Sequence, residues 1–205
     1  MRFLSAWNIV IAVWAGLGLA AAAAANTMAA TGQTPAAQSS PGLAVGQMRN
    51  FTLFTPPRPV AEAPFKDGAG REMNLSAFRG KVVLVNLWAT WCAPCRAEMP
   101  AIDRLQGELG GPDFAVVAIS QDRAGRDKAQ AFLDELGMKH LKLYIDDTMR
   151  SARQFGATGL PVTFILDRQG REVGRLIGPA EWDSPEALRL IRHFIDPETP
   201  KRTER

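Results

Sequence analysis

Cys92 and Cys95 are the residues whose type and spacing point most directly to chemistry, and they are the only cysteines in the 205-residue sequence. Residues three apart are neighbours on a helix surface, so both sulfurs are expected on the first turn of a helix. Unpaired N–H groups and a partial positive charge at a helix N-terminus favour a thiolate and lower a cysteine pKa from ~8.5 to roughly 3.5–7.5. Because the thiolate attacks disulfides, the pair predicts a dithiol that cycles to a disulfide and back.

Other interpretations of the cysteine pair are weaker. Two cysteines in a chain of this length do not make a structural disulfide framework, and closing so short a loop adds little stability. The pair is also compatible with half of a metal site or with unreactive core thiols. However, no second cysteine pair exists, and the only histidines, His140 and His193, are far away in sequence. We expect both histidines to be ordinary surface or core residues, and we expect no metal and no other cofactor.

A buried strand and a helix must position the cysteines. Residues 82–88 are a nearly continuous aliphatic run, typical of a central strand covered on both faces. Apolar residues then recur at helical spacing through Leu109. The further expected elements are a strand over 114–119, helices over 127–136 and 151–155, a hairpin of strands ending at 166 and 177, and a helix from Ser184 that Pro197 stops. This order predicts an α/β fold, a mixed sheet flanked by helices on both faces, with its chemistry at the carboxyl end of the first central strand.

The region before that strand predicts a smaller addition to the sheet. Residues 51–53 are a short strand candidate, and residues 55–59 are expected to leave the sheet because proline cannot donate to a strand ladder. The turn residues 67–70 separate two further strand candidates, 60–65 and 73–75. They predict an N-terminal hairpin extension.

The N-terminus predicts export. Residues 1–25 carry Arg2 and then a long uncharged apolar run, which fits a membrane anchor with Arg2 in the cytoplasm. The alternative is a signal peptide cleaved after Ala25. Residues 26–46 have the composition of a flexible linker, residues 47–196 form the expected domain, and residues 197–205 an expected disordered tail. Either interpretation places the domain in an oxidising compartment, on the periplasmic side of a bacterial inner membrane if it is anchored.

The charge pattern argues against nucleic acid as a partner. The formal net charge is +3, and Lys and Arg residues are mixed with Asp and Glu along the chain. We therefore expect a solvated surface of mixed charge.

Residues 88–100 resemble the thioredoxin superfamily and, more narrowly, its exported and often membrane-anchored TlpA/ResA branch. Residues 78–88 and 159–161, with the hairpin that follows, are similar to the same branch, and the resemblance covers about residues 45–195. It implies a thioredoxin fold and a thiol–disulfide oxidoreductase, in which Cys92 attacks a partner disulfide and Cys95 resolves the mixed disulfide.

The resemblance also implies roles for neighbours of the cysteines. Pro161 is expected to be a cis-proline facing the sulfurs, and the backbone of Leu160 to pair with a bound peptide. Trp91 is expected at the surface rim, shielding Cys92 and meeting partners together with Ala93 and Pro94. Trp88, by contrast, is expected in the core.

Glu98 follows Cys95 by one turn, and related proteins carry a glutamate at the matching place. A partly buried carboxyl there has a raised pKa and can act as the base that deprotonates Cys95. The alternative is a solvated helix glutamate. The buried aspartate of cytosolic thioredoxins matches Asn86 here, which cannot titrate, so Glu98 is the nearest candidate for moving a proton.

The leading functional hypothesis is a protein-disulfide reductase. The branch is associated with cytochrome c maturation and with assembly of the copper centre of cytochrome oxidase. The stretch 60–73 and the Ala-Pro dipeptide between the cysteines are most similar to TlpA, which favours the copper-centre role. Expected partners are the disulfide- or dithiol-containing proteins of these pathways and a membrane thiol donor, and the chain itself is expected to be a monomer.

Two alternatives stay open. The first is a disulfide-forming oxidant on the same fold, since the dipeptide tunes the reduction potential without fixing it. The second is a non-enzymatic copper-binding assembly factor, which needs ligands beyond two sulfurs. A peroxidase is disfavoured, because no threonine stands at the expected spacing before a lone reactive cysteine.

Overall fold

The computed structural model describes residues 42–196, which lie within one compact unit of the chain. In this part, one sheet is formed by β1 (Thr52–Arg58), β2 (Phe65–Asp67), β3 (Glu72–Met73), β4 (Val82–Trp88), β5 (Phe114–Ser120), β6 (Tyr144–Ile145), β7 (Val162–Leu166) and β8 (Glu172–Ile177). The helices are α1 (Ala93–Leu109), α2 (Arg126–Glu135), α3 (Arg150–Gln154) and α4 (Pro185–Ile195), with 3-10 turns at Gly46–Met48 and Leu75–Phe78. The predicted segments 1–25 and 197–205, and the predicted linker up to residue 41, lie outside the described residues.

The predicted central strand is β4, and all seven of its residues are buried. It pairs in parallel with β5 and antiparallel with β7, and the sheet order is β1-β8-β7-β4-β5-β6-β2-β3. A strand with apolar side chains on both faces is stable only between two layers. The predicted α/β fold with a mixed sheet is therefore confirmed.

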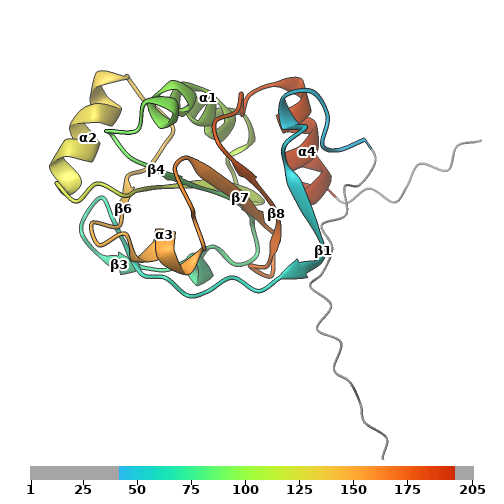
Figure 1. Cartoon of the computed structure of the whole chain (residues 1–205), viewed down its shortest axis with the longest axis horizontal. Coiled ribbons are helices and arrows are strands. Elements are labelled where there is room, and N and C mark those ends of the chain that lie inside the picture. The colour runs from blue at the N-terminus through green and yellow to red at the C-terminus, as the bar shows by residue number, and fades with distance from the viewer. Residues whose placement is uncertain (1–41, 197–205) are drawn as a thin grey trace, which may run out of the picture. The chain divides into compact units, whose positions relative to one another are not determined.

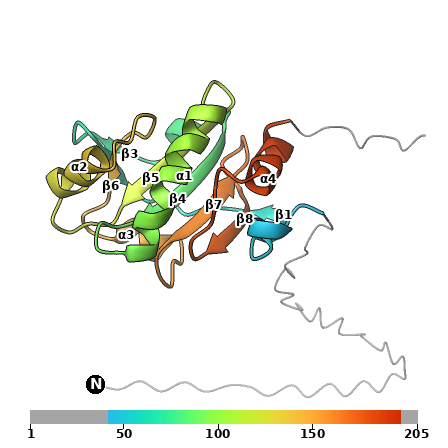
Figure 2. The ribbon, with the colours of Figure 1, turned by 90° about the horizontal axis from the view of Figure 1, so that it is seen from above.

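Helices cover both faces of this sheet (Figure 1). α1 and α4 lie on one face, where Ile102 and Leu190 join a core cluster that includes Leu84. α3 lies on the opposite face, where Phe155 belongs to a second cluster with Val85. Figure 2 shows α1 running across the middle of the sheet. The helix that begins at the cysteines is thus anchored along its length by the core.

β1 corrects one expectation. Residues 55–59 were expected to leave the sheet, but β1 continues through Pro56 and Pro57 to Arg58. The reason is its position, because β1 is an edge strand that pairs only with β8. An edge strand has one side without a neighbour, where a missing N–H removes no ladder bond, and no residue between Leu53 and Arg58 is paired with β8. A register shift between Leu53 and Arg58 accommodates the two prolines.

The predicted N-terminal hairpin is present, but its strands are displaced. Residues 60–64 are not a strand, β2 begins at Phe65 and extends into the predicted turn, and β3 ends at Met73. β2 and β3 pair antiparallel across the turn at residues 68–71, and β2 also pairs with β6. The hairpin therefore forms the edge of the sheet opposite β1. Its Asp67 accepts backbone N–H groups from Ala69 and Arg71, which closes the turn.

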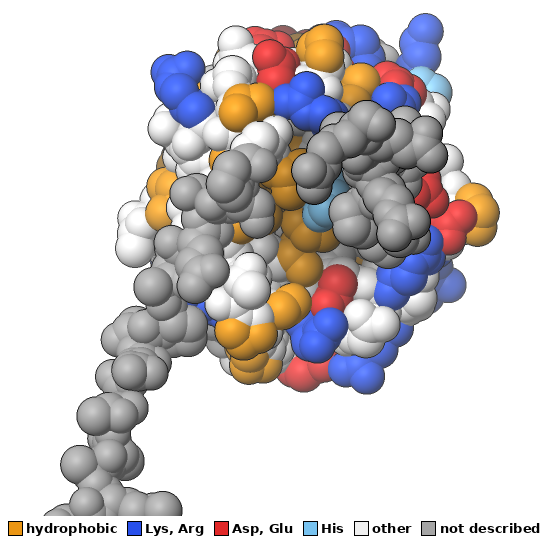
Figure 3. Space-filling view, turned by 90° about the vertical axis from the view of Figure 1, so that its right-hand side faces the viewer, with side chains coloured by type: hydrophobic (Ala, Val, Ile, Leu, Met, Phe, Trp, Pro, Cys, Tyr) orange, Lys and Arg blue, Asp and Glu red, His pale blue; other side chains and the backbone are white. Residues whose placement is uncertain are grey.

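The described surface is mixed in charge, as predicted. Figure 3 shows Lys and Arg side chains interspersed with Asp and Glu over one face of the molecule. His140 and His193 are both exposed. Within residues 42–196, no helix has the length and apolar character needed to cross a membrane.

Candidate active site

The two cysteines lie at the start of α1, as their spacing predicts. Cys92 is the residue that caps the helix, and its Sγ accepts the N–H of Cys95 at 3.3 Å. The structure holds the pair in the oxidised state, as a disulfide. Cys92 is 5% exposed and Cys95 is fully buried. Cys92 is therefore the outer sulfur, and once reduced it faces N–H donors of the first helical turn that stabilise a thiolate.

The segment before the cysteines is a tight turn between β4 and α1. The N–H of Cys92 donates to the carbonyl of Ala89 at 3.1 Å, and the carbonyl of Trp88 accepts the N–H of Gln121 at 2.8 Å. Trp88 is fully buried, as predicted, and packs on the Phe132 ring of α2 at a centroid distance of 5.5 Å. The end of β4 is thereby fixed to β5 and to the helix layer.

Trp91 lies at the outer side of this turn and is 60% exposed, which confirms its predicted surface position. Ala93 and Pro94 are also exposed. Exposed apolar side chains beside a nearly buried sulfur offer a contact surface for another protein. The roles of these three residues in binding remain predictions.

The second predicted part of the site is the loop before β7. The peptide bond between Leu160 and Pro161 is cis, as expected. The carbonyl of Pro161 accepts the N–H of Gly178 at 2.9 Å, which ties the loop to the end of β8. The residue after Pro161, Val162, is paired with Leu87 near the end of β4. The cis-proline loop before β7 and the cysteine turn after β4 therefore lie at the same end of these two paired strands.

Glu98 is buried, with 3% of its surface exposed, so it is not a solvated helix residue. Its Oε1 accepts the Asn86 amide at 2.8 Å. Its Oε2 accepts the backbone N–H of Ala180 at 3.1 Å and the indole N–H of Trp182 at 3.2 Å. Burial raises the pKa of Glu98 from 4.5 to about 7, although its three hydrogen bonds act in the opposite direction. A carboxyl with this pKa can both take up and release a proton near neutral pH.

Asn86 is the centre of this polar cluster. Its Nδ2 donates to Glu98 and also to the hydroxyl of Thr163 at 2.8 Å, from the paired residue of β7. Its Oδ1 is buried and has no hydrogen-bond partner among the described residues. Protonated Glu98 is a donor, so a rotated Asn86 amide provides it with an acceptor. The cluster can thus accommodate either protonation state of Glu98.

Three partners of Glu98 and Asn86 escape sequence reasoning: Thr163, Ala180 and Trp182. They come from β7 and from the loop between β8 and α4, more than 75 residues further along the chain. A weak signal exists for Thr163, which is a polar residue in an otherwise apolar strand. No corresponding pattern marks Trp182.

Metal ligands do not gather at this site. Within residues 42–196, no three side chains of His, Cys, Asp or Glu come together in a way that holds a metal ion. The arrangement of the site suits sulfur chemistry, with the outer cysteine Cys92 capping α1, the fully buried Cys95 in its first turn and the titratable carboxyl of Glu98 one turn later.

Comparison with protein families and curated proteins places these features in context. Residues 52–171 match the model of the AhpC/TSA family. The thiol:disulfide interchange protein HelX of Rhodobacter capsulatus is 36% identical over 137 residues, which cover 67% of this chain and 68% of HelX. The thiol-disulfide oxidoreductase ResA of Bacillus anthracis is 30% identical over 112 residues, or 55% of this chain and 64% of ResA. The chain therefore spans about two-thirds of HelX and slightly less of ResA.

Solved structures give the same result. A thiol:disulfide interchange protein DsbE from Chlorobium tepidum superposes with a TM-score of 0.61 at 25% identity, over 68% of this chain and 97% of that one. A DsbF homologue from Corynebacterium diphtheriae gives a TM-score of 0.58 at 25% identity, over 76% and 96%. With the Cys92–Cys95 pair at the start of α1, these matches show that the chain belongs to the AhpC/TSA family, as a TlpA/ResA-like thiol–disulfide oxidoreductase with a thioredoxin fold.

Proposed function

We propose that this chain reduces disulfides of partner proteins outside the cytoplasm. The observation that carries the proposal is the position of the two cysteines: Cys92 caps α1 and keeps 5% of its surface exposed, whereas Cys95 is fully buried. A partner protein can reach the Cys92 sulfur more readily than the Cys95 sulfur, which is open only to attack on or by Cys92 itself. This asymmetry supports separate roles for the two cysteines.

In the proposed reaction, the Cys92 thiolate attacks one sulfur of a partner disulfide. A mixed disulfide forms, and the other partner sulfur leaves as a thiolate and takes up a proton. The Cys95 thiolate then attacks the Cys92 sulfur and releases the second partner thiol. Two electrons have passed to the partner, and the chain is left with the Cys92–Cys95 disulfide that the structure holds. A separate thiol donor must reduce it again.

Glu98 is proposed as the group that takes the proton from Cys95 in the second step. It follows Cys95 by one helical turn, is buried, and has a pKa of about 7. A base with a pKa near the working pH is the most effective in proton transfer. Asn86, at the place of the thioredoxin aspartate, contributes hydrogen bonds only.

The partner is proposed to bind across the cis-proline loop. The backbone of Leu160 would pair with an extended segment of the partner, as an added strand does, and Pro161 would hold that segment near the sulfurs. Trp91, Ala93 and Pro94 would contact it from the other side. Their exposure supports this role.

Trapping of the mixed disulfide tests the proposal. In the Cys95→Ser variant, Cys92 has no resolving partner, so a covalent complex with the substrate protein is expected to accumulate. The Cys92→Ser variant is the matched control and is expected to trap nothing, because Cys95 is buried. Equal trapping by both variants would contradict the assignment of roles.

The identity of the trapped protein addresses the pathway. We propose partners in copper-centre assembly of cytochrome oxidase or in cytochrome c maturation, on the basis of the resemblance. The chain is proposed to act as a monomer on the periplasmic side of the inner membrane, held by residues 1–25. A trapped protein with neither copper-binding nor haem-attaching cysteines would argue against both pathways.

The opposite direction of electron flow is the second candidate. The name of HelX describes thiol:disulfide interchange and specifies no direction. Equilibration of the chain with glutathione separates the two, since a potential well below the glutathione pool means a reductant and one well above it means an oxidant.

A further inference from the structure

Asp122 is a buried acidic residue that the proposed mechanism does not use. It follows β5 at the carboxyl end of the sheet and is 1% exposed. Its Oδ1 accepts the hydroxyl of Thr90 at 2.6 Å, and its Oδ2 accepts the backbone N–H of Thr90 at 2.9 Å. Oδ2 also accepts the hydroxyl of Ser120 at 2.6 Å. The carboxyl group thus accepts hydrogen bonds from both the backbone and the side chain of Thr90.

Thr90 lies in the turn that presents the outer sulfur. It stands between the end of β4 and Cys92, whose N–H closes the turn on Ala89. Among the described residues, Asp122 is the only side chain with a recorded hydrogen bond to the backbone of residues 89–91. The Cys92 sulfur can meet the first-turn N–H groups of α1 only while this turn keeps its shape.

We propose that Asp122 is a positioning residue for thiol–disulfide exchange: it holds Thr90 so that Cys92 stays at the start of α1. The inference rests on the proposed function of the cysteine pair. The hydrogen bonds of the Asp122 carboxylate go to Thr90 and Ser120 and not to either cysteine. Its effect passes through the backbone of the turn.

Two substitutions of Asp122 distinguish a role in holding the turn from an effect of its negative charge. In the Asp122→Asn variant, the amide oxygen at the place of Oδ2 still accepts the Thr90 N–H and the Ser120 hydroxyl. The amide nitrogen at the place of Oδ1 donates to the Thr90 hydroxyl, which can rotate to accept. Asparagine therefore keeps all three contacts without the acidic group. Alanine keeps none of them.

The test measures the rate at which the reduced chain exchanges with a small aromatic disulfide, and the pH midpoint of Cys92 alkylation. For Asp122→Ala, we expect roughly 10- to 100-fold slower exchange and a midpoint that moves up toward the ~8.5 of free cysteine. For Asp122→Asn, we expect exchange within about twofold of the wild type and an unchanged midpoint, because the contacts persist. A role through negative charge predicts the opposite sign, since removing an anion favours the thiolate and lowers the midpoint in both variants.

Substitutions at Thr90 test the same contact from the other side. Thr90→Val keeps the backbone bond and loses the hydroxyl, so exchange is expected to slow several-fold. Thr90→Ser keeps both and is expected to match the wild type. This pair remains informative if Asp122→Ala fails to fold.

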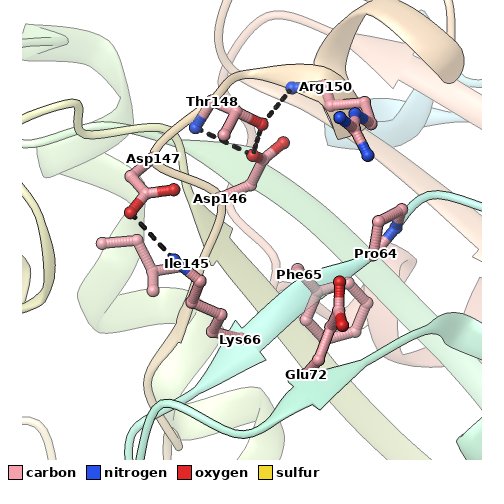
Figure 4. Close-up of a pocket in the computed structure, with 9 residues that line it drawn as sticks. All are labelled: Pro64, Phe65, Lys66, Glu72, Ile145, Asp146, Asp147, Thr148 and Arg150. Carbon is pink, nitrogen blue, oxygen red and sulfur yellow. Dashed lines mark hydrogen bonds and ion pairs between the residues drawn. The ribbon is translucent and has the colours of Figure 1, made fainter.

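Asp146 provides a matched control. It is also buried after a strand, and it accepts the backbone N–H and hydroxyl of Thr148, as Figure 4 shows, and those of Ser151. Its contacts hold the start of α3 instead of the cysteine turn. Asp146→Ala is therefore the match for Asp122→Ala, and it is expected to leave exchange and the alkylation midpoint unchanged.

The outcomes are distinguishable. If Asp122→Ala exchanges with the small disulfide as fast as the wild type does, the positioning role is overturned. A downward shift of the Cys92 alkylation midpoint in Asp122→Asn would overturn it as well. A wild-type chain that does not exchange at all would overturn the proposed function itself.

Discussion

Replacing Glu98 by glutamine is expected to remove a pH dependence of stability. Glu98 has a pKa of about 7 in the folded chain, against an ordinary value of 4.5. Between these two values the folded state binds a proton that the unfolded state has lost. Stability therefore falls as the pH rises through this window, by about 1.4 kcal/mol per pH unit. Below pH 4.5 the full stability is present, and above pH 7 the loss is complete.

The size of the effect follows from the interval between the two pKa values. From 4.5 to about 7, the accumulated loss is about 3 kcal/mol. Glutamine is uncharged at every pH and has no such loss. The Glu98→Gln variant is thus expected to match the wild type near pH 4.5 and to be more stable by up to about 3 kcal/mol at pH 8.

The surroundings of Glu98 can accept glutamine. Its amide oxygen, at the place of Oε2, still accepts from Ala180 and Trp182. Its amide nitrogen, at the place of Oε1, needs an acceptor, and Asn86 has an Oδ1 without a partner in the described structure. A rotated Asn86 amide supplies this acceptor and can also accept the hydroxyl of Thr163.

Denaturant unfolding of the oxidised chain at pH 4.5, 6 and 8 measures the effect. The disulfide prevents the cysteines from titrating, and the difference in slope between Glu98→Gln and the wild type isolates the contribution of Glu98, because all other titratable groups are shared. Glu181→Gln, at an exposed residue next to Ala180, controls for the loss of one charge. A Glu98→Gln variant with the wild-type slope, or one less stable than the wild type at pH 8, would refute the assignment of a raised pKa to Glu98.

The other shifted carboxyls do not disturb this window. At Asp67, hydrogen bonds from Arg71 hold the pKa below 3.8. At Asp146, hydrogen bonds from Thr148 and Ser151 outweigh burial and also lower the pKa. Stability that depends on these two groups is present above their ordinary pKa and is lost only as the pH falls below it.

Three further predictions concern single contacts. Trp182→Phe removes an N–H donor to Glu98, so the Glu98 pKa should rise further and unfolding at pH 8 should show a loss of roughly 1.5–3 kcal/mol, with a smaller loss at pH 4.5. Asp103→Ala leaves the backbone N–H groups of residues 139–141 without their buried acceptor, and thermal or denaturant unfolding should show a loss of about 2 kcal/mol. Trp91→Ala should change stability by less than about 0.5 kcal/mol, because the side chain is 60% exposed, yet slow the reduction of a protein disulfide while the rate with a small disulfide stays the same.

Short-range patterns predicted the reactive part of the site. The three-residue spacing marks Cys92 and Cys95, and a continuous apolar run marks the strand before them. Both signals are local in the sequence. The cis bond at Pro161 was expected only through the resemblance, because nothing local distinguishes it from an ordinary trans proline. The structure confirms these expectations about position and conformation.

Contacts made by the fold were not predictable in this way. Trp182 reaches Glu98 across 84 residues and Asp122 reaches Thr90 across 32, and no period in the sequence encodes such pairs. The path of β1 through Pro56 was mispredicted for a related reason. Whether a strand tolerates proline depends on its place in the sheet, which is decided by the whole topology.

The two prolines of β1 have a consequence beyond the fold. An exposed strand edge is a template on which other chains can add and begin to aggregate. Here Pro56 and Pro57 remove N–H donors from β1, which is one edge of the described sheet, and the other edge is β3, which is only two residues long. Neither edge therefore presents a long row of free backbone groups with which another chain could pair. A thiol–disulfide oxidoreductase with these two edges can therefore contact a partner protein through the loops around Cys92 without offering a long strand edge on which that partner could add.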